Sequence, residues 1–360
     1  MTQTLAFEPP PLDGFLAWNE SSTSGEAIRA ALEAARGSSG AVGDLLREAA
    51  QVVITGAGSS YYLAGTAAAV GREVTGRLVT AAPLSEVLLR PSGVVLDVPT
   101  SMVPVIVISR SGTTSEAVSV VRQMRERGHP TIAVTCRAES PLARAADLTL
   151  VSPAGDEGAI VMTRSFASML ALLLRVLAPL GTQTGLAADL DRSPAFWSEA
   201  MAAALTGRRL GLTSWSRIVI LGGGANFWLA TEWGLKLTET SQVATNAYEP
   251  FEFRHGPISV CEPGVLVVGL LGGPGTEDER RVIAEAARLG ASTWVIGQDA
   301  DDLRDGSGET SLIGSGLHPH ARLPLLAHPS HALALTLAVT RGRDPDAPRH
   351  LGQVVIIDGD

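Results

Sequence analysis

The chain contains two related halves. Residues 52–64 (VVITGAGSSYYLA) align without a gap on residues 218–230 (IVILGGGANFWLA). Further along, residues 105–136 parallel residues 267–297 as strand, loop, helix, glycine turn and strand, which is the order of a βαβ unit. A repeat unit of this length indicates a duplicated domain rather than a solenoid of short repeats.

The repeat and the length together predict two α/β domains. At 360 residues the chain is long enough for two domains of about 150 residues each. Apolar runs such as residues 103–108 (VPVIVI) are continuous rather than alternating, which is typical of parallel strands buried on both faces. We predict the first domain at 42–195 and the second at 197–345, joined through a proline- and glycine-marked region at 179–194.

Shorter segments are predicted at both ends. Residues 1–41 form an N-terminal extension with a helix, and residues 346–360 form a C-terminal tail. Ser24 precedes a helical pattern at 25–35 and is expected to cap it, while the glycines within 37–40 are expected to end it.

Composition excludes several classes of function. The formal net charge of −9 argues against a nucleic-acid partner. The two cysteines lie far apart in sequence and indicate neither a disulfide nor a zinc site, which fits a reducing compartment. The N-terminus lacks the basic and apolar regions of a signal peptide, and we expect no membrane-spanning stretch, because the candidate at 169–180 is too short. We therefore expect a cytoplasmic protein that does not bind a membrane.

Hydroxyl groups crowd two strand-to-helix turns of the first repeat. Ser59 and Ser60 follow the first strand, and residues 109–115 (SRSGTTS) form a second turn. The second repeat has residues 225–226 (AN) and 271–276 (LGGPGT) at the matching places. Its turns therefore kept their shape and lost nearly all of their hydroxyls.

The hydroxyl-rich turns are predicted to bind a phosphate group. Both lie at the carboxyl ends of parallel strands, where helix N-termini offer free N–H groups to an anion, and Arg110 adds a candidate charge-assisted contact. A cluster of helix-capping residues is the alternative, because Thr114 followed by Glu116 also resembles a helix start. A nucleotide site has less support, since residues 56–58 (GAG) lack the third glycine of a dinucleotide fingerprint and no phosphate-loop lysine follows.

The second repeat carries a charged helix face. Glu232, Lys236 and Glu239 lie four and three residues apart in the segment TEWGLKLTE, so they share one face. Lys236 is the only lysine of the chain, as expected if this site needs a compact ammonium or an amine that can lose its proton. The alternatives are a solvated Glu–Lys pair and the chance survival of one lysine.

A histidine follows on a restricted loop. Residues 246–257 (NAYEPFEFRHGP) interrupt the second βαβ unit, and glycine and proline directly after His255 fix the backbone there. An imidazole donates or accepts a proton near neutral pH, which makes His255 a candidate acid-base group; a capping or core-edge histidine is the alternative. The other histidines show no metal-ligand spacing, so we predict no metal site.

As a set, these motifs resemble the SIS (sugar isomerase) family, in particular the isomerase half of glucosamine-6-phosphate synthase and the stand-alone phosphosugar isomerases and deaminases. The resemblance rests on GAGSSYY, SRSGTTSE, VMTRSFASM, EWGLKLTE, AYEPFEFRHGP and DPDAPRHL. It implies a double SIS: two tandem flavodoxin-like three-layer αβα sandwiches with parallel sheets. It also implies a homodimer with shared active sites.

The resemblance also implies roles for individual residues. Glu239 matches the base that moves a proton between C1 and C2 of the sugar, His255 matches a ring-opening histidine supplied by the partner subunit, and Lys236 matches a lysine lining the same site. No metal or cofactor is required for such chemistry. The residues matched to phosphate binding are Ser60, Ser109, Arg110, Ser111 and Thr114, and the hydroxyls of Ser59 and Thr113 in the same turns are added as candidates.

Two departures from the family pattern bear on the activity. The synthase has a cysteine after its initiator methionine where this chain has Thr2, and we expect neither a glutaminase domain nor glutamine-dependent transfer. Gln353 stands where the synthase relatives carry a tail lysine, so an imine with the sugar would fall to Lys236 or not form.

We therefore expect a phosphosugar isomerase or deaminase that acts on a hexosamine 6-phosphate or a ketohexose 6-phosphate. Two alternatives stay open: a phosphosugar sensor without chemistry, and a deglycase of sugar-phosphate amino-acid adducts.

Overall fold

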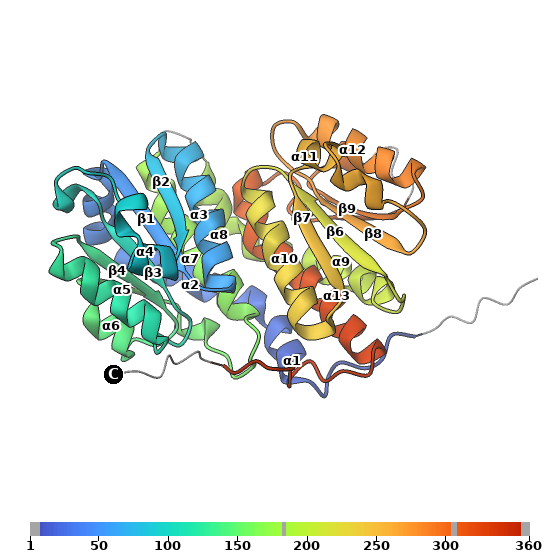
Figure 1. The fold of residues 1–360 in the computed structure, drawn as a ribbon, viewed down its shortest axis with the longest axis horizontal. Coiled ribbons are helices and arrows are strands. Elements are labelled where there is room, and N and C mark those ends of the chain that lie inside the picture. Colours follow the sequence, from blue (N-terminus) through green and yellow to red (C-terminus); the bar gives the residue numbers. More distant parts are fainter. Residues whose placement is uncertain (1–7, 182–184, 304–307, 354–360) are drawn as a thin grey trace, which may run out of the picture.

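The computed structural model describes residues 8–181, 185–303 and 308–353, which form two lobes (Figure 1). Each lobe is built on one five-stranded sheet. The strands of lobe one are β1 (Gln51–Gly56), β2 (Leu78–Pro83), β3 (Val105–Ile108), β4 (Thr131–Thr135) and β5 (Leu148–Val151). Those of lobe two are β6 (Arg217–Gly222), β7 (Ala244–Tyr248), β8 (Val265–Leu270), β9 (Ser292–Gly297) and β10 (Glu309–Leu312).

The two sheets have the same topology. Their orders are β2-β1-β3-β4-β5 and β10-β9-β8-β6-β7, and every pairing is parallel. Counted from the other edge, the second order repeats the first, and both are flavodoxin-like. The register agrees as well, because Val53 pairs with Val105 in lobe one and Val219 with Val267 in lobe two. The prediction of two tandem parallel α/β sandwiches is confirmed.

Helices cover both faces of each sheet. On one face α2, α3 and α7 of lobe one and α9, α10 and α13 of lobe two join in a single apolar core, whereas α4 to α6 and α11 to α12 cover the outer faces. The central strands β1, β3, β4 and β8 are therefore buried along their whole length. The helices are α1 (Leu16–Ser22), α2 (Ser24–Arg47), α3 (Ser59–Thr75), α4 (Leu84–Leu89), α5 (Ser115–Glu126), α6 (Pro141–Ala145), α7 (Arg164–Leu177), α8 (Leu186–Arg192), α9 (Trp197–Leu210), α10 (Ala225–Ser241), α11 (Pro250–Arg254), α12 (Thr276–Arg288) and α13 (Ala327–Thr340).

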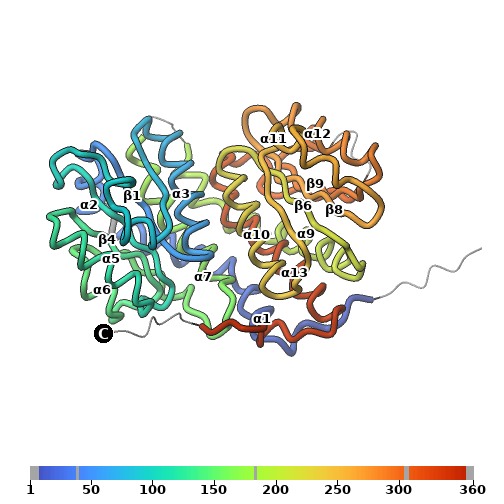
Figure 2. The backbone as a smooth tube through the Cα atoms, in the orientation of Figure 1, coloured from blue at the N-terminus to red at the C-terminus, as the bar shows by residue number. Residues whose placement is uncertain are grey.

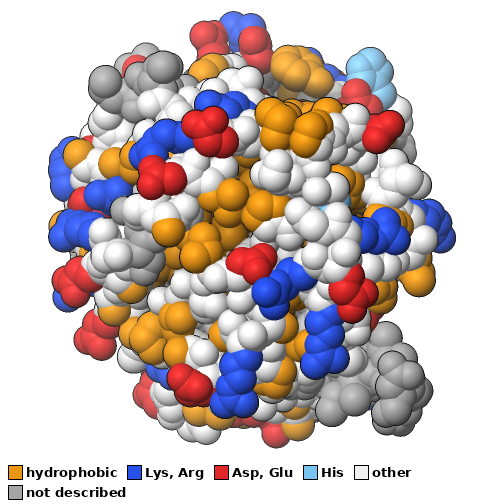
Figure 3. Space-filling view, turned by 90° about the vertical axis from the view of Figure 1, so that its left-hand side faces the viewer, with side chains coloured by type: hydrophobic (Ala, Val, Ile, Leu, Met, Phe, Trp, Pro, Cys, Tyr) orange, Lys and Arg blue, Asp and Glu red, His pale blue; other side chains and the backbone are white. Residues whose placement is uncertain are grey.

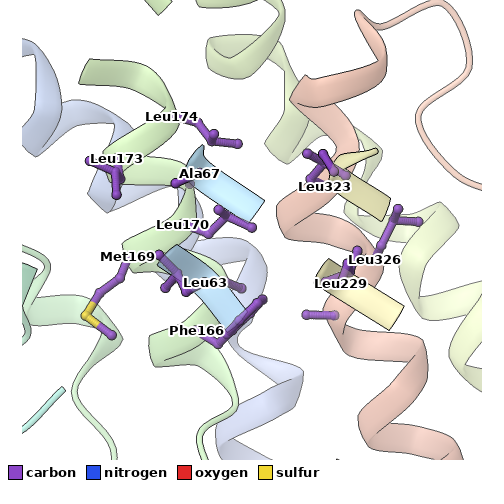
Figure 4. Close-up of a cluster of buried hydrophobic side chains, with 14 of the residues drawn as sticks. Leu63, Ala67, Phe166, Met169, Leu170, Leu173, Leu174, Leu229, Leu323 and Leu326 are labelled. Carbon is purple, nitrogen blue, oxygen red and sulfur yellow. The ribbon is translucent and has the colours of Figure 1, made fainter. Parts of the chain in front are cut away.

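The lobes meet through α3 and α10, the equivalent first helices of the two repeats. Figure 4 shows Leu63 of α3 and Leu229 of α10 in the same cluster of buried side chains. A Cβ atom added to Gly65 would lie 2.1 Å from the ring of Trp228, so only glycine allows α10 to approach this closely. This contact brings the charged face of α10 to the turns of lobe one.

Two glycines build the turn that precedes each of these helices. Gly58 and Gly224 have φ of +54° and +55°, a backbone conformation that favours glycine. A Cβ atom on Gly56 or Gly222 would lie 2.5 Å and 2.6 Å from the backbone of the following helix. Both repeats therefore keep the same glycine turn for the same steric reason.

Helix α2 differs from the sequence prediction. It runs from Ser24 to Arg47, through the glycines that were expected to end it. Ser24 does not cap it, since its hydroxyl donates to the carbonyl of Ser21 and the N-cap position is Thr23. The buried face of α2, which includes Ile28 and Leu46, packs on α7. This tertiary packing outweighs the helix penalty of about 1 kcal/mol per glycine.

A second correction concerns membrane-length helices. Among the described residues, Pro319–Thr340 is long and apolar enough by composition to cross a membrane, which the sequence prediction had missed. However, 89% of its apolar window is buried inside the fold, where it forms η8 (Pro319–Leu326) and α13. The burial shows why this stretch is so apolar: it is a core element of lobe two.

Candidate functional site

One pocket brings together candidate residues from both lobes. Its volume is about 310 Å³, near the lower end for small-molecule sites. The turns after β1 and β3 line it together with the C-terminal tail segment 351–353, and α10 contributes Lys236 and Glu239. The predicted phosphate-binding residues that line it are Ser59, Ser60, Ser109, Arg110, Ser111 and Thr114.

The turn after β3, residues 109–114, is held by its own hydroxyls. The Ser109 hydroxyl lies 3.1 Å from that of Thr114 and accepts from the N–H of Gly112 at 3.2 Å. Gly112 has a φ of +62°, and a Cβ atom there would lie 2.2 Å from the Ser140 hydroxyl. Thr114 occupies the N-cap position of α5 without a side-chain capping bond. The Ser109 and Thr114 side chains thus shape the turn and also line the pocket.

Two other hydroxyl residues divide between the pocket wall and solvent. The Thr113 hydroxyl donates to that of Ser111 at 2.8 Å, but Thr113 itself is exposed and does not line the pocket. Ser60 donates to the Met162 sulfur at 3.7 Å. The structure therefore brings all of the predicted phosphate-binding residues except Thr113 to the pocket.

The charged face of α10 is buried. Lys236 is hydrogen-bonded to Glu239, and its Nζ atom lies 3.4 Å from Glu232 Oε1. The side chains of Lys236 and Glu232 are only 2% and 0% exposed, and Glu239, at 13%, faces the pocket. A solvated surface pair is thus excluded, and the cluster places an ammonium and a carboxylate at the pocket.

Burial and charge set the protonation of this cluster. Burial and, to a smaller extent, the charge of Glu239 raise the pKa of Glu232 to about 7, against the opposing effects of Lys236 and the Ser59 hydroxyl. Burial alone would lower the pKa of Lys236, but Glu232 and Glu239 raise it above its usual value. Lys236 is therefore held as an ammonium between two carboxyl groups.

Arg110 does not extend freely into the pocket. Its guanidinium donates to the carbonyls of Ala159 at 2.8 Å and Gln353 at 3.2 Å, and lies 3.5 Å from Glu157 Oε1. The side chain is 6% exposed and that of Glu157 is fully buried. The sequence places Arg110 among hydroxyl groups, but the structure directs its guanidinium toward a loop and the tail.

His255 lies away from the pocket within one chain. It follows α11 in lobe two, is exposed and is not among the pocket residues. The structure therefore does not bring His255 together with Lys236 and Glu239 in a single subunit.

Sequence reasoning missed the loop before α7. Ile160, Val161 and Met162 line the pocket, and the loop is organised by the buried carboxylates of Glu157 and Glu20. Part of this loop lies in the segment VMTRSFASM, a motif of the family resemblance in which the sequence alone assigns no residue a role. The sequence shows Glu20 and Glu157, but only the structure shows that both are buried and bind the backbone of this loop.

The fold and the site define a class: a two-lobed α/β protein in which hydroxyl-rich turns of one lobe face an acid and an amine of the other. Comparison with protein-family models identifies the family. The chain belongs to the SIS domain family, whose model matches residues 45–178 and 211–303.

Several curated proteins are similar to this chain in sequence. Glutamine–fructose-6-phosphate aminotransferase (isomerizing) of Sulfurisphaera tokodaii is 31% identical over 260 residues, 71% of this chain and 42% of that protein. The chain spans about half the length of the curated relatives it matches.

Two solved structures cover nearly the whole chain. The structure of glucosamine-6-phosphate deaminase from Thermotoga maritima matches with a TM-score of 0.76 and 27% identity, covering 95% of this chain and 99% of that one. The C-terminal domain of glucosamine-fructose-6-phosphate aminotransferase from Francisella tularensis matches with a TM-score of 0.82 and 20% identity, covering 94% and 100%.

Proposed function

We propose that this protein is an amino-sugar phosphate deaminase of the phosphosugar isomerase group, acting on a hexosamine 6-phosphate. The observation that carries the proposal is the meeting of Glu239 and Lys236 with the hydroxyl turn at 109–114 in one pocket. The match to a glucosamine-6-phosphate deaminase at 27% identity supports the proposal, and Gln353 in place of a tail lysine argues against an aminotransferase.

The proposed chemistry assigns a separate task to each part of the pocket. The serine and threonine hydroxyls and the N-terminus of α5 hold the phosphate, since both offer donors to an anion. This anchor sets the far end of the open-chain sugar near Glu239. Positioning of this kind converts proton transfer into a step within one complex.

Glu239 then acts as the general base. It takes the proton from C2 of the open-chain amino-aldose, the C2–H electron pair forms the C1–C2 double bond, and the carbonyl oxygen gains a proton from an acid. Return of the proton to C1 gives a ketimine, and water replaces its nitrogen to release ammonia and a ketose phosphate. The Lys236 ammonium stabilises the negative charge that develops on the oxygen.

Ring opening is assigned to His255 of a second copy. The residue is exposed in one chain, and Phe251 beside it exposes 52% of its surface. Figure 3, which looks at the lobe-one side of the molecule, also shows apolar side chains at the surface. We infer a homodimer in which each His255 completes the pocket of the other subunit, because this accounts for an exposed imidazole that lies outside the pocket of its own chain.

The test is turnover by the purified protein. With glucosamine 6-phosphate we expect ammonia and fructose 6-phosphate in equal amounts, followed by a coupled ammonia assay and by phosphosugar chromatography. Glu239→Gln should lower kcat by at least about 100-fold while phosphosugar binding persists. Glu73→Gln is the matched control, because Glu73 holds the equivalent position in the first repeat and does not line the pocket.

The result that refutes the deaminase is unambiguous. Interconversion of ketose and aldose phosphates without ammonia release would identify an isomerase. Binding measured by thermal shift without turnover of any amino-sugar, ketose or sugar-adduct phosphate would identify a sensor.

A further inference from the structure

We propose that Arg110 is a positioning residue that fastens the C-terminal tail over the pocket, and not a ligand of the substrate phosphate. The pocket's use for a phosphosugar is the function proposed above, and this inference rests on it only for the identity of the ligand. The tail segment concerned is 351–353, and the loop concerned is 157–162.

Arg110 is fixed at both its backbone and its side chain. Its carbonyl accepts from the N–H of Cys136 and the hydroxyl of Thr135, each at 3.0 Å, which holds the residue at the edge of the sheet. Its NH1 group donates to the carbonyls of Ala159 at 2.8 Å and Ile160 at 3.4 Å. The guanidinium therefore binds loop 157–162 through two of its backbone carbonyls.

The same guanidinium holds the tail. Its NH2 group donates to the carbonyl of Gln353 at 3.2 Å. The side-chain amide of Gln353 in turn donates to the carbonyls of Gly158 at 3.1 Å and Glu157 at 3.3 Å. Tail, loop and Arg110 thus form one closed set of hydrogen bonds beside the pocket.

Two carboxylates accept hydrogen bonds from backbone N–H groups in and directly after the same loop. Glu20 of α1 accepts from Gly158 at 2.7 Å and Ala159 at 2.9 Å. Glu157 accepts from the N–H of Thr163 at 2.9 Å and from its hydroxyl at 2.6 Å. These three N–H groups are committed to acids and are therefore not available to an anion beside Arg110.

Charge favours the same interpretation. Glu157 is fully buried, and the Arg110 guanidinium counters the rise in its pKa that burial causes. A phosphate on Arg110 would compete with this carboxylate for the guanidinium. The exchange would leave a buried carboxylate without its cation, which is unfavourable.

The tail has a second anchor before the pocket. Asp346 accepts from the N–H groups of Leu16 at 2.6 Å and Ala17 at 2.8 Å, at the start of α1. Figure 2 shows the described part of the tail running alongside the N-terminal segment from lobe two to lobe one. Between the two anchors, Leu351 and Gly352 line the pocket. Releasing the Arg110 end should therefore open one wall of the pocket.

The attachment of the tail to Arg110 can be tested by limited proteolysis without any substrate. Trypsin cuts after Arg349, which lies between the two anchors, and cleavage requires local release of the segment. In Arg110→Gln we expect this cut, followed by intact mass, to occur about tenfold faster than in the parent protein, as for loss of a charge-assisted hydrogen bond. Gln353→Ala loses the two neutral hydrogen bonds of its side-chain amide and should also be cut faster than the parent. Ser111→Ala, a change in the phosphate turn alone, should leave the rate unchanged.

Binding of inorganic phosphate separates the two roles of Arg110. By calorimetry, Arg110→Gln should bind phosphate within about twofold of the parent, while Ser111→Ala should bind it more weakly. Unchanged tail protection in Arg110→Gln together with lost phosphate binding would overturn the proposal. Where Arg110→Gln does not fold, Arg110→Lys carries the same test, since an ammonium keeps the charge but cannot bridge loop and tail in the same way.

These readouts do not depend on catalysis. Failure of the deaminase assay with a loosened tail in Arg110→Gln would refute the proposed function and keep the tail role. Turnover of glucosamine 6-phosphate by the parent protein, together with a tail that Arg110→Gln does not loosen, would support the proposed function and refute the tail role.

Discussion

Replacing Lys236 by methionine should destabilise the fold in a way that depends on pH. Methionine keeps the apolar stem of lysine but removes the ammonium that lies between Glu232 and Glu239. Glu232 is fully buried, so it loses its compensating charge with no access to water. Removing one partner of a buried pair costs about 3–5 kcal/mol, and we expect a loss of this order at pH 8.

The pH dependence follows from Glu232. Its pKa of about 7 in the fold against 4.5 for the free carboxyl corresponds to about 3 kcal/mol of lost stability once the pH exceeds both values. The sign is that of a raised acid: below pH 4.5 both states are protonated and nothing is lost, and stability falls as the pH rises toward 7. Without Lys236 the folded pKa rises further, so the fall continues to higher pH.

Urea unfolding at pH 5.5, 7 and 8.5 measures the difference. Above pH 7 the gap between the parent and Lys236→Met should widen by up to about 1.4 kcal/mol per pH unit. Glu232→Gln is the control, because it removes the titrating group, and the double variant should lose the steep pH dependence. The reasoning would be refuted if the free energy of unfolding changed with pH equally in the parent and in Lys236→Met above pH 7. It would also be refuted if the variant carrying both Lys236→Met and Glu232→Gln kept the pH dependence of Lys236→Met.

Three further predictions can be checked separately. Because Lys236 is the only lysine and is held charged by two carboxyl groups, borohydride reduction with fructose 6-phosphate should leave no sugar adduct on it; peptide mass spectrometry showing one would contradict this. Gly65→Ala should lower the free energy of unfolding by about 1–3 kcal/mol, measured in urea, because its Cβ would overlap Trp228. Gly37→Ala should raise it by about 1 kcal/mol, because the residue is in the middle of α2 with open space around it; a decrease would contradict the observed extent of the helix.

The sequence predicted the sheets better than it predicted the helix ends. Buried parallel strands leave a continuous apolar run, which local sequence reveals, and comparing the two repeats aligned β1 with β6 correctly. The end of α2 depends on packing against α7, more than one hundred residues further along the chain. Local glycine content does not record such a contact, so the predicted end was wrong.

The site shows the same division. The cluster of Glu232, Lys236 and Glu239 follows from helix periodicity, and its burial adds to that prediction without changing it. The orientation of Arg110 does not follow from its neighbours in sequence, because its partners stand 47 and 243 positions away. His255 is a third case, since the role proposed for it in a second subunit would leave no contact with the pocket of its own chain.

Within the described residues, the two repeats differ at the carboxyl edges of their sheets. In lobe two, Glu279 of α12 reaches the glycine turn, where a Cβ atom on Gly223 would lie 2.1 Å from its Oε1 atom. Burial, together with the nearby charges of Glu249 and Asp302, raises the pKa of Glu279 to about 7, so this edge of the sheet disfavours an anion. The carboxyl edge for which we propose phosphate binding in lobe one is thus acidic in lobe two. Lobe two contributes to the pocket through α10 instead. The close contact at Gly65 brings the charged face of this helix to the hydroxyl-rich turns of lobe one.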